Sequence, residues 1–291
     1  MGKKWLSVLF LFAALVLDAQ WWDDGQFDWS SAAQLVPGIK YVQLEKSDPR
    51  IMKIWVMQVE LNGSFRFHTS KKAAEYGETV PTHTHLKIHT KRQRTADFMS
   101  QLRDQGFEVV AAVNGAPWSP WDGIYSPYAS NLGLLISDGE VVSPVLKGRP
   151  SFIVYKDGSV DLRCVGENED LTNIDQAITG FGFVLVNGNV LPSGAGTAPR
   201  TGYGLSADKK YLYLLVVDGR QPDFSMGCPT SEVGFMLKYF GAFNGVNMDG
   251  GGSTTLIYWD EKAGEMVSLC RHTKSGYERF VGSSPGIFIK E

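Results

Sequence analysis

The chain has 291 residues, of which 43% are hydrophobic and 20% are charged, a balance typical of globular proteins. Its formal net charge of −3 provides no overall basic field that would attract nucleic acid or an anionic membrane surface. The length is sufficient for one large domain or two small ones.

The N-terminus has the pattern of a signal peptide. Lys3 and Lys4 precede an apolar run at 5–17, and Ala19 stands where such peptides are cleaved. We therefore predict a signal peptide at 1–19 and export of the mature protein, either to a periplasm or out of the cell. An uncleaved anchor is the alternative, but the apolar run is short for a membrane span. No second hydrophobic span follows, so we expect no stable membrane span after cleavage.

The next segment is polar and then rich in strand signals. Residues 20–33 are predicted to form a linker or arm, and strands are expected at 39–45 and 51–61. In the second strand, alternate residues are apolar, which is typical of a strand with one buried face. These residues belong to a predicted N-terminal extension, 20–92, whose strands pack on a main catalytic domain at 93–291.

Residues 69–92 are basic and lack clear periodicity, so we expect a solvated loop. His83, His85 and His89 lie within it, and on a strand the first two would share a face. Lysines and arginines surround them in the sequence, whereas no carboxylate or cysteine stands beside them. We therefore predict neither a metal nor a cofactor.

Three cysteines are present, Cys164, Cys228 and Cys270. In an exported protein two of them could form a disulfide and leave one free thiol. There is no CxxC motif, so a cysteine-based zinc site is not indicated.

Two helices are predicted. The first runs from Thr95, its expected N-cap, to residue 105, with Phe98, Met99 and Leu102 as its buried stripe and Gly106 as its stop. A buried strand at 108–113 follows it.

The second helix is expected at 231–240, with Thr230 as its N-cap and Gly241 as its stop. Glu232 lies in its first turn, where a carboxylate favours the helix dipole. A structural role for Glu232 is therefore expected, in support of the site.

Between the helices, apolar runs are separated by residues typical of tight turns. Asp-Gly and Asn-Gly tolerate positive φ and are strong hairpin signals. The four expected turns contain Asp138-Gly139, Asp157-Gly158, Asn187-Gly188 and Asp208-Lys209. Repeated hairpins with two helices predict a single α+β domain, in which a few helices pack on a mostly antiparallel or mixed β-sheet.

The most informative segment is an aspartate followed by three glycines and hydroxyl side chains between two apolar runs. It contains Asp249, Gly250, Gly251, Gly252, Ser253 and Thr254. Glycines let the backbone approach a ligand closely, and successive backbone N–H groups can bind an anion. The pattern therefore indicates either a plain hairpin turn or a phosphate site with a carboxylate at its head.

Four further positions carry polar groups next to apolar runs. Asn114 follows the buried strand at 108–113, Arg200 opens a strand, and Asp218 and Arg220 follow the most apolar strand. Each has an ordinary alternative, since Asn-Gly and Asp-Gly mark turns and arginines are common on surfaces. Arginine, however, grips phosphate oxygens through two parallel hydrogen bonds.

In this order, the motifs resemble the phosphodiester glycosidase family from about residue 93 to the C-terminus. The most specific part is the segment 241–255, and the others are Arg94 to Phe98, Ala112 to Gly115, Pro199 to Thr201, Val217 to Arg220 and Arg279 to Val281. Two places depart from the family pattern. Ala116-Pro117-Trp118 stands where Gly-Phe-Phe is usual, and Gly202-Tyr203-Gly204 follows the Arg-Thr pair. Both departures affect the expected substrate pocket.

The resemblance implies hydrolysis of a sugar-1-phosphodiester at the anomeric carbon, for example a diester of N-acetylglucosamine 1-phosphate. The leaving phosphomonoester has a second pKa of about 6, so it departs at neutral pH with little help from an acid. We expect Arg200 and the backbone N–H groups of 250–253 to hold the phosphate, with Ser253 and Thr254 as further donors. Asp249 or Asp218 would act as base or nucleophile.

Asn114 is expected to bind the sugar, with Arg220 and Glu232 in supporting roles. Two other functions stay open from the sequence. One is a phosphodiesterase or wall-polymer processing enzyme that cuts the P–O bond. The other is a non-catalytic carbohydrate-binding protein that uses the aromatic residues of 20–29 and 117–128.

Overall fold

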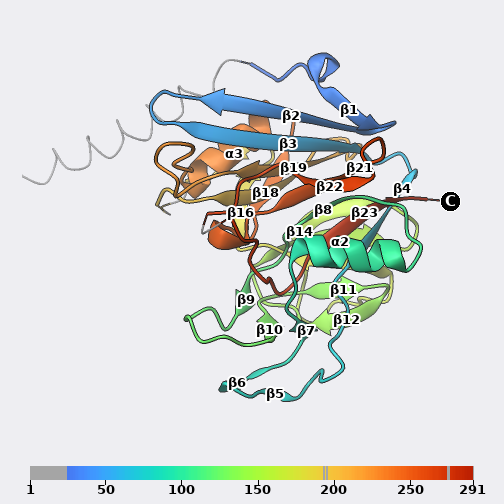
Figure 1. Cartoon of the computed structure of the whole chain (residues 1–291). Helices are drawn as coiled ribbons and strands as arrows, with labels where there is room; N and C mark the ends of the chain where they lie inside the picture. The colour runs from blue at the N-terminus through green and yellow to red at the C-terminus, as the bar shows by residue number, and fades with distance from the viewer. Residues whose placement is uncertain (1–24, 193, 195, 274–275, 291) are drawn as a thin grey trace, which may run out of the picture.

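The structure is a computed structural model that describes residues 25–192, 194, 196–273 and 276–290. The predicted signal peptide at 1–19 lies outside the described residues. Figure 1 shows a stack of β-sheets with one helix on the outer face of each of two sheets. No helix in the described part of the chain is long and apolar enough to cross a membrane.

The largest sheet has eight strands in the order β1-β2-β3-β19-β18-β20-β16-β17. Its strands are β1 (Ala33–Val36), β2 (Ile39–Lys46), β3 (Met52–Glu60), β16 (Gly182–Val186), β17 (Asn189–Val190), β18 (Arg200–Leu205), β19 (Tyr211–Val217) and β20 (Asn244–Asn247). The segment predicted as an N-terminal extension therefore contributes three strands to the same sheet as the residues of the site.

Two five-stranded sheets lie against it. The first, in the order β22-β21-β8-β23-β4, contains β4 (Phe65–Thr69), β8 (Val109–Val113), β21 (Leu256–Asp260), β22 (Glu265–Ser268) and β23 (Pro285–Ile289). The second, in the order β12-β11-β15-β13-β14, contains β11 (Leu135–Ser137), β12 (Glu140–Ser143), β13 (Pro150–Tyr155), β14 (Val160–Cys164) and β15 (Ile174–Thr179).

Short strands complete the β structure. A three-stranded sheet consists of β7 (Thr90–Lys91), β10 (Tyr128–Asn131) and β9 (Trp118–Ser119), and β5 (Thr79–Val80) pairs with β6 (His83–Lys87). The basic segment 69–92 was predicted to be a loop, and this was wrong, since β5, β6 and β7 lie within it. Their lengths of two to five residues leave too few alternations for a pattern to show.

The two helices are α2 (Thr95–Asp104) and α3 (Thr230–Tyr239), and single 3₁₀ turns occur at η1 (Trp29–Ser31) and η2 (Gly251–Ser253). Every strand pairing between the named strands is antiparallel. The predicted fold, a single α+β domain of hairpins with a few helices, is confirmed.

The main core lies between the eight-stranded sheet and the two five-stranded sheets, and a second core lies between the eight-stranded sheet and α3. The strand β3 contributes to both. Met57 and Val59 face the first core, whereas Ile54 and Val56 face the second, and all four are 0% exposed. The prediction that only one face of β3 is buried was wrong. The core beneath α3 also covers the face of Ile54 and Val56, which the alternation of residues had marked as partly polar.

Both helices begin one residue earlier than predicted, since in each case the residue before the expected N-cap is the actual N-cap. Arg94 is the N-cap of α2, and Thr95 is its first helical residue. The carboxylate of Glu278 accepts hydrogen bonds from the backbone N–H groups of Thr95 and Ala96. A residue from the far end of the chain therefore supplies the cap, which local sequence does not reveal. Likewise, Pro229 rather than Thr230 is the N-cap of α3.

The four predicted hairpins are present, as β11-β12, β13-β14, β16-β17 and β18-β19, and two of them have turns with positive φ at both central residues. Asp138 and Gly139 have φ of 52° and 76°, and Asn187 and Gly188 have φ of 50° and 73°. Positive φ at both central residues defines a type I′ turn, whose twist matches that of the flanking strands. The buried stripe predicted for α2, Phe98 with its neighbours, is also confirmed.

The histidines and cysteines are placed apart from one another. Nε2 of His83 lies 2.8 Å from a carboxylate oxygen of Asp122, a residue that is distant from the histidines in the sequence. All three cysteines are free thiols. Cys228 belongs to the α3 core and Cys270 to the main core, on opposite faces of the large sheet, so these two cannot meet in a disulfide.

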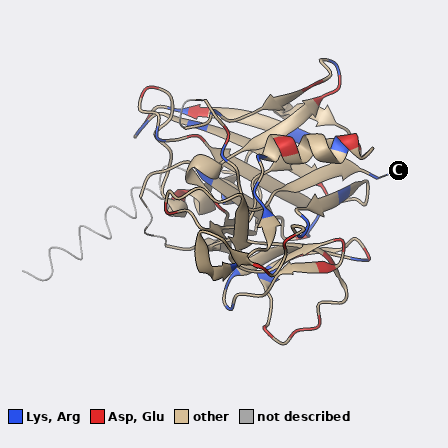
Figure 2. Cartoon of the chain, turned by 60° about the horizontal axis from the view of Figure 1, so that its bottom comes forward, with Lys and Arg blue, Asp and Glu red and all other residues tan. Residues whose placement is uncertain are grey.

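Charged residues of both signs are distributed along the whole ribbon rather than gathered in one region (Figure 2). This distribution agrees with the small net charge of −3 and with the absence of any long-range attraction for a polyanion. Recognition of an anionic ligand must therefore come from local groups.

Candidate active site

The glycine-rich segment forms the crossing from one sheet to another. It leaves β20 of the eight-stranded sheet, makes the single 3₁₀ turn η2 and enters β21 of the first five-stranded sheet. Asp249 stands at the head of this turn. Arg200, at the start of β18, is paired with Val217, at the end of β19. These two strand ends therefore lie at the same end of the sheet.

Asn114 holds this turn in place through hydrogen bonds. Its side-chain Nδ2 donates a hydrogen bond to the backbone oxygen of Asp249 at 2.6 Å. Its Oδ1 accepts from the Thr201 hydroxyl at 2.7 Å and from the backbone N–H of Thr255 at 3.0 Å. The Tyr203 hydroxyl donates to its backbone oxygen at 2.8 Å. Because Asn114 is 0% exposed, these contacts favour positioning of the turn; binding of the sugar stays a prediction.

The carboxylate of Asp249 is half-buried and accepts two hydrogen bonds. Nε1 of Trp118 donates to Oδ2 at 3.1 Å, and the backbone N–H of Gly250 donates to Oδ1 at 2.9 Å. Burial raises the pKa of Asp249 to about 6, against the opposing effects of Ser253, the Gly250 N–H and the charge of Arg279. The Ser253 hydroxyl lies near the carboxylate but outside the geometry of a full hydrogen bond. Near neutral pH, Asp249 can therefore change its charge.

Each of the three glycines has its own steric reason. A Cβ on Gly250 would stand 2.9 Å from the Pro199 oxygen, and a Cβ on Gly252 would stand 2.6 Å from the guanidinium of Arg279. Gly251 has a φ of +64°, which other residues seldom adopt. The triplet thus lets β18 and an arginine approach the turn closely.

The backbone N–H groups of the turn are mostly occupied within the protein. Gly250 donates to its neighbour Asp249, Gly251 donates to Pro199 at 2.9 Å, and Ser253 donates to Gly250 at 3.2 Å. Of the four amides at 250–253, Gly252 alone has no acceptor among the described residues. An anion site built from all four amides is therefore not preformed, since only the N–H of Gly252 is without an acceptor among the described residues; phosphate binding here stays a prediction.

Two arginines lie directly against the turn. A Cβ on Gly251 would be 3.1 Å from Nη1 of Arg220, and Arg279 occupies the corresponding space beside Gly252. Both arginines are exposed, and among the described residues neither side chain makes a hydrogen bond or an ion pair. Arg220 also has a φ of 58°, an uncommon conformation for a residue other than glycine. Two unpaired cations therefore flank the glycines.

The backbone of Arg200 lies close to the turn, but its side chain contacts other parts of the protein. Its guanidinium donates to the backbone oxygens of Cys228, at 3.0 Å, and Gly196. Burial and the nearby charge of Arg220 lower the pKa of Arg200, while Cys228 opposes this. These contacts use two of the five N–H donors of the guanidinium, and the predicted grip of Arg200 on phosphate stays a prediction.

Asp218 lies on the opposite face of the sheet from the Arg200 side chain. It is 1% exposed, and its carboxylate accepts hydrogen bonds from Nε1 of Trp55 at 3.1 Å and from the backbone N–H of Arg271 at 2.8 Å. Burial raises its pKa to about 6, against those two hydrogen bonds. These contacts favour a structural role, and its catalytic role stays a prediction.

Glu232, predicted as a supporting residue, is 0% exposed and forms an ion pair with Arg50. Arg50 also donates to the backbone oxygen of Gly227 at 2.9 Å. Through Arg50, the start of α3 is connected to Gly227 in the loop before the helix. The next residue in that loop, Cys228, supplies the carbonyl oxygen that Arg200 contacts. Glu232 therefore contacts Arg50 rather than the turn, and its supporting role stays a prediction.

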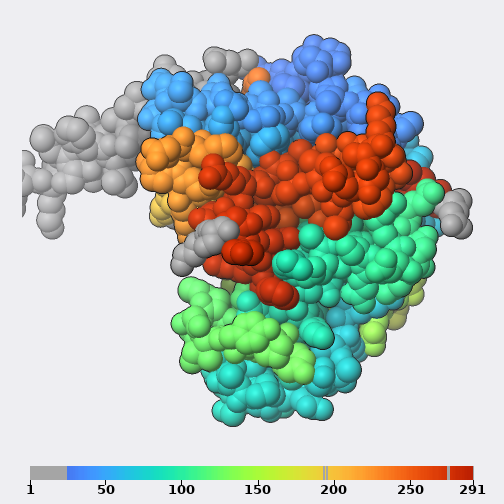
Figure 3. Space-filling model, viewed as in Figure 1, coloured from blue at the N-terminus to red at the C-terminus, as the bar shows by residue number. Residues whose placement is uncertain are grey.

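Sequence reasoning singled out neither Arg279 nor the pair formed by Arg92 and Trp118 as site residues. The guanidinium of Arg92 stacks 4.1 Å over the ring of Trp118, the residue that donates to Asp249. Trp118 is one of the departures from the family pattern, and a phenylalanine there has no N–H to donate. In Figure 3 the C-terminal segments coloured red border the green segment that carries β9 and β10.

Among the described residues, no group of three or more His, Cys, Asp or Glu side chains is arranged to hold a metal ion. The turn presents one carboxylate, together with one amide and two guanidinium groups that have no partner among the described residues. Such a set suits an anion bound beside a reacting carbon.

A sequence model of the family described as phosphodiester glycosidase matches residues 107–288, more than half of the chain. The chain therefore belongs to the phosphodiester glycosidase family. A search of curated protein sequences gives no significant match.

Several solved structures share the fold. The catalytic domain of zebrafish N-acetylglucosamine-1-phosphodiester alpha-N-acetylglucosaminidase, auto-inhibited by a pro-peptide, matches with a TM-score of 0.60 at 19% identity, covering 90% of this chain and 87% of that one. A hypothetical protein from Synechocystis matches at 0.58 and 11%, covering 88% and 63%. A protein from Burkholderia pseudomallei described as exported matches at 0.53 and 12%, covering 82% and 74%. At these identities the likeness establishes the fold.

Proposed function

We propose that this protein hydrolyses a sugar-1-phosphodiester at the anomeric carbon and releases the free sugar and a phosphomonoester. A diester of N-acetylglucosamine 1-phosphate is the first substrate to consider, since the zebrafish enzyme of similar fold carries that name. The observation that carries the proposal is a carboxylate of raised pKa, Asp249, at the head of a turn flanked by Arg220 and Arg279.

The charge changes of the reaction suit these groups. A phosphodiester carries one negative charge, and breaking the bond between carbon and oxygen leaves a phosphomonoester that carries up to two. The arginines beside Gly251 and Gly252 would stabilise the leaving group more strongly as that second charge develops. Interactions that strengthen in the transition state accelerate the chemical step.

The sugar carbon develops positive charge as the phosphate leaves, and a carboxylate beside it stabilises that charge or activates water. We propose Asp249 for this role, acting as nucleophile or as base. The indole N–H of Trp118 holds one oxygen, Oδ2, in a defined orientation. A leaving group with a second pKa of about 6 needs little protonation, so a second carboxylate such as Asp218 need not act as an acid.

We also propose that the mature protein is exported. The support is the sequence pattern of 1–19, with two lysines before an apolar run and an alanine at the expected cleavage position. An exported enzyme of this kind would meet phosphodiester-linked sugars of surface or secreted polymers.

The function is tested by incubating the purified mature protein with a panel of methyl sugar-1-phosphodiesters that differ only in the sugar. We expect free sugar and methyl phosphate to appear in equal amounts from at least one member, with N-acetylglucosamine the first to examine. Turnover of none of the panel, by a protein shown to be folded by circular dichroism, would contradict the proposal.

A further inference from the structure

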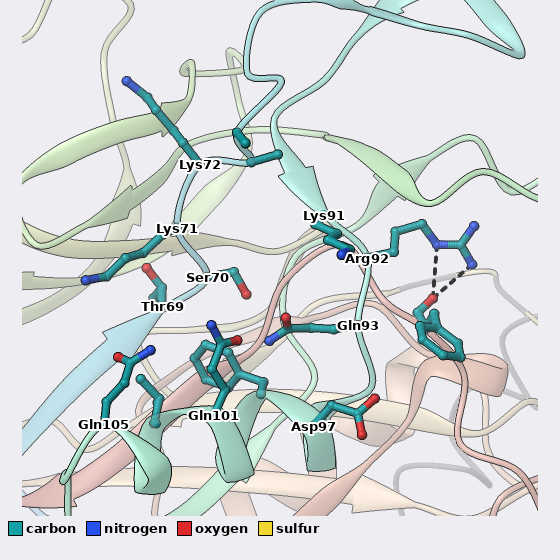
Figure 4. A pocket seen from close by; sticks show the side chains of 15 residues that line it. Thr69, Ser70, Lys71, Lys72, Lys91, Arg92, Gln93, Asp97, Gln101 and Gln105 are labelled. Atoms are coloured by element: carbon teal, nitrogen blue, oxygen red, sulfur yellow. Dashed lines mark hydrogen bonds between the residues drawn. The ribbon is translucent and has the colours of Figure 1, made fainter.

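A cavity of about 480 Å³ lies on the far side of the segment that carries Arg279. Residues from β4, β7 and α2 line it, together with Phe280. Its volume is within the range of small-molecule sites in proteins. Figure 4 shows Ser70, Gln93 and Gln101 with their polar ends directed into the space between α2 and the segments opposite.

The lining is rich in neutral hydrogen-bonding groups that the protein does not use. Gln93 is half-buried and Gln101 exposed, and among the described residues neither side-chain amide makes a hydrogen bond. Each amide offers two donors and one acceptor oxygen. The ring of Phe280, which is 40% exposed, supplies an apolar face beside them. Amides next to an aromatic ring suit a sugar, which presents hydroxyl groups at its edges and C–H groups on its faces.

The same cavity is cationic. Lys71 and Lys72 line it but form ion pairs with Asp138 and Glu140, at 3.0 Å and 2.8 Å. Lys91 also lines it and has no carboxylate partner among the described residues, whereas the guanidinium of Arg92 donates to the backbone oxygens of Phe280 and Ser126. Asp97, the acid of the lining, is paired with Arg94.

The cavity is also coupled to the proposed active site. Arg92 lines the cavity and stacks on Trp118, whose N–H holds the Asp249 carboxylate. Phe280 lines the cavity, and the preceding residue, Arg279, lies against Gly252 of the turn. The two sites are therefore neighbours, joined by Arg92 and by two consecutive residues of one segment.

We propose that this cavity binds a second sugar unit of the substrate together with its anionic group, so that the enzyme acts on a chain of phosphodiester-linked sugars. Here the side-chain amides of Gln93 and Gln101 bind the hydroxyl groups, and Lys91 binds the charge. This inference rests on the proposed function, since it assigns a substrate class to the same site.

The test uses the Lys91→Ala/Gln101→Ala double variant of the full mature chain. Kinetic constants are measured on the methyl diester of N-acetylglucosamine 1-phosphate and on a tetramer of N-acetylglucosamine 1-phosphate units joined by phosphodiesters. We expect KM for the tetramer to rise about tenfold, since one charge-assisted and one neutral hydrogen bond are lost. The constants for the methyl diester should not change.

The matched control is Lys262→Ala/Gln43→Ala, which removes one exposed lysine and one exposed glutamine away from the cavity. It should behave as the unaltered protein on both substrates. An unchanged KM for the tetramer in the cavity variant would overturn the inference. So would an equal loss on both substrates, which would show that the variant damages the active site instead.

Calorimetric titration with the tetramer separates this inference from the proposed function. If the protein hydrolyses neither substrate, the proposed function fails. In that case, tetramer binding that weakens about tenfold in the cavity variant would still support the cavity. An uncharged tetramer of N-acetylglucosamine that binds as tightly as the phosphate tetramer would overturn the assignment of Lys91 to an anionic group.

Discussion

Replacing Asp249 with Asn should lower kcat/KM on a sugar-1-phosphodiester by about 10²- to 10⁴-fold, the contribution typical of a positioned carboxylate. Asparagine has nearly the same shape and can still accept from Trp118, so the turn should keep its conformation. What it lacks is the negative charge that would stabilise the developing positive charge on the sugar carbon. Steady-state kinetics with the best diester of the panel measure the effect.

The pH dependence of the unaltered enzyme provides a second test of the role of Asp249. Because the pKa of Asp249 is raised to about 6, the carboxylate is ionised above that pH and protonated below it. Activity that needs the ionised form should therefore fall as the pH falls through about 6. The control is Asp223→Asn, an exposed aspartate in a nearby loop, which should leave the rate unchanged. Full activity of the Asp249→Asn protein would remove Asp249 from the mechanism.

The second large effect is expected from Arg220→Ala/Arg279→Ala. These two guanidinium groups lie beside Gly251 and Gly252 and make no hydrogen bond or ion pair among the described residues. A hydrogen bond to a charged group contributes about 1.5–3 kcal/mol, so each single variant should lose about 10- to 150-fold in kcat/KM and the double variant about 10²- to 10⁴-fold. Kinetics of the two single variants and the double variant on one diester measure these losses.

Arg66→Ala serves as the control, since Arg66 is an exposed arginine on β4 that takes no part in the turn. The double variant should also lose its discrimination between the diester and an uncharged methyl glycoside of the same sugar. If its KM and kcat on the diester are unchanged, the phosphate must be held elsewhere, and Arg200 becomes the first alternative.

The local structure of this protein was largely readable from the sequence. The turns at Asp138-Gly139 and Asn187-Gly188 need positive φ at two successive residues, and few residue pairs other than Asp-Gly and Asn-Gly provide it. The stripe of Phe98, Met99 and Leu102 identified α2 because residues three and four apart share one helix face.

Features made by distant segments were not readable in this way. The residue that caps α2, Glu278, is far from that helix in the sequence. Likewise, α3 covers a face of β3 that the alternation of residues marked as partly polar. The short strands of 69–92 owe their pairing to their neighbours, so their own sequence carries little signal.

The site shows the same division. Asp249 and the three glycines were recognisable because the chemistry lies in consecutive residues. The sequence did not indicate that the amides of the turn would be used internally, that Asp218 would be enclosed by Trp55, or that Arg279 would lie against Gly252. These relations depend on which strands are neighbours, and a single sequence does not specify the neighbours of a strand.

The most direct test of the account is hydrolysis of a sugar-1-phosphodiester in water enriched in oxygen-18, followed by mass spectrometry of the phosphomonoester. The phosphate oxygens do not exchange with water under these conditions, so the label reports which bond was cut. Attack at the anomeric carbon, with Asp249 beside the sugar and the arginines beside the phosphate, predicts a phosphomonoester without the label. A phosphomonoester that carries one oxygen-18 would show cleavage of the P–O bond and would contradict the proposed reaction.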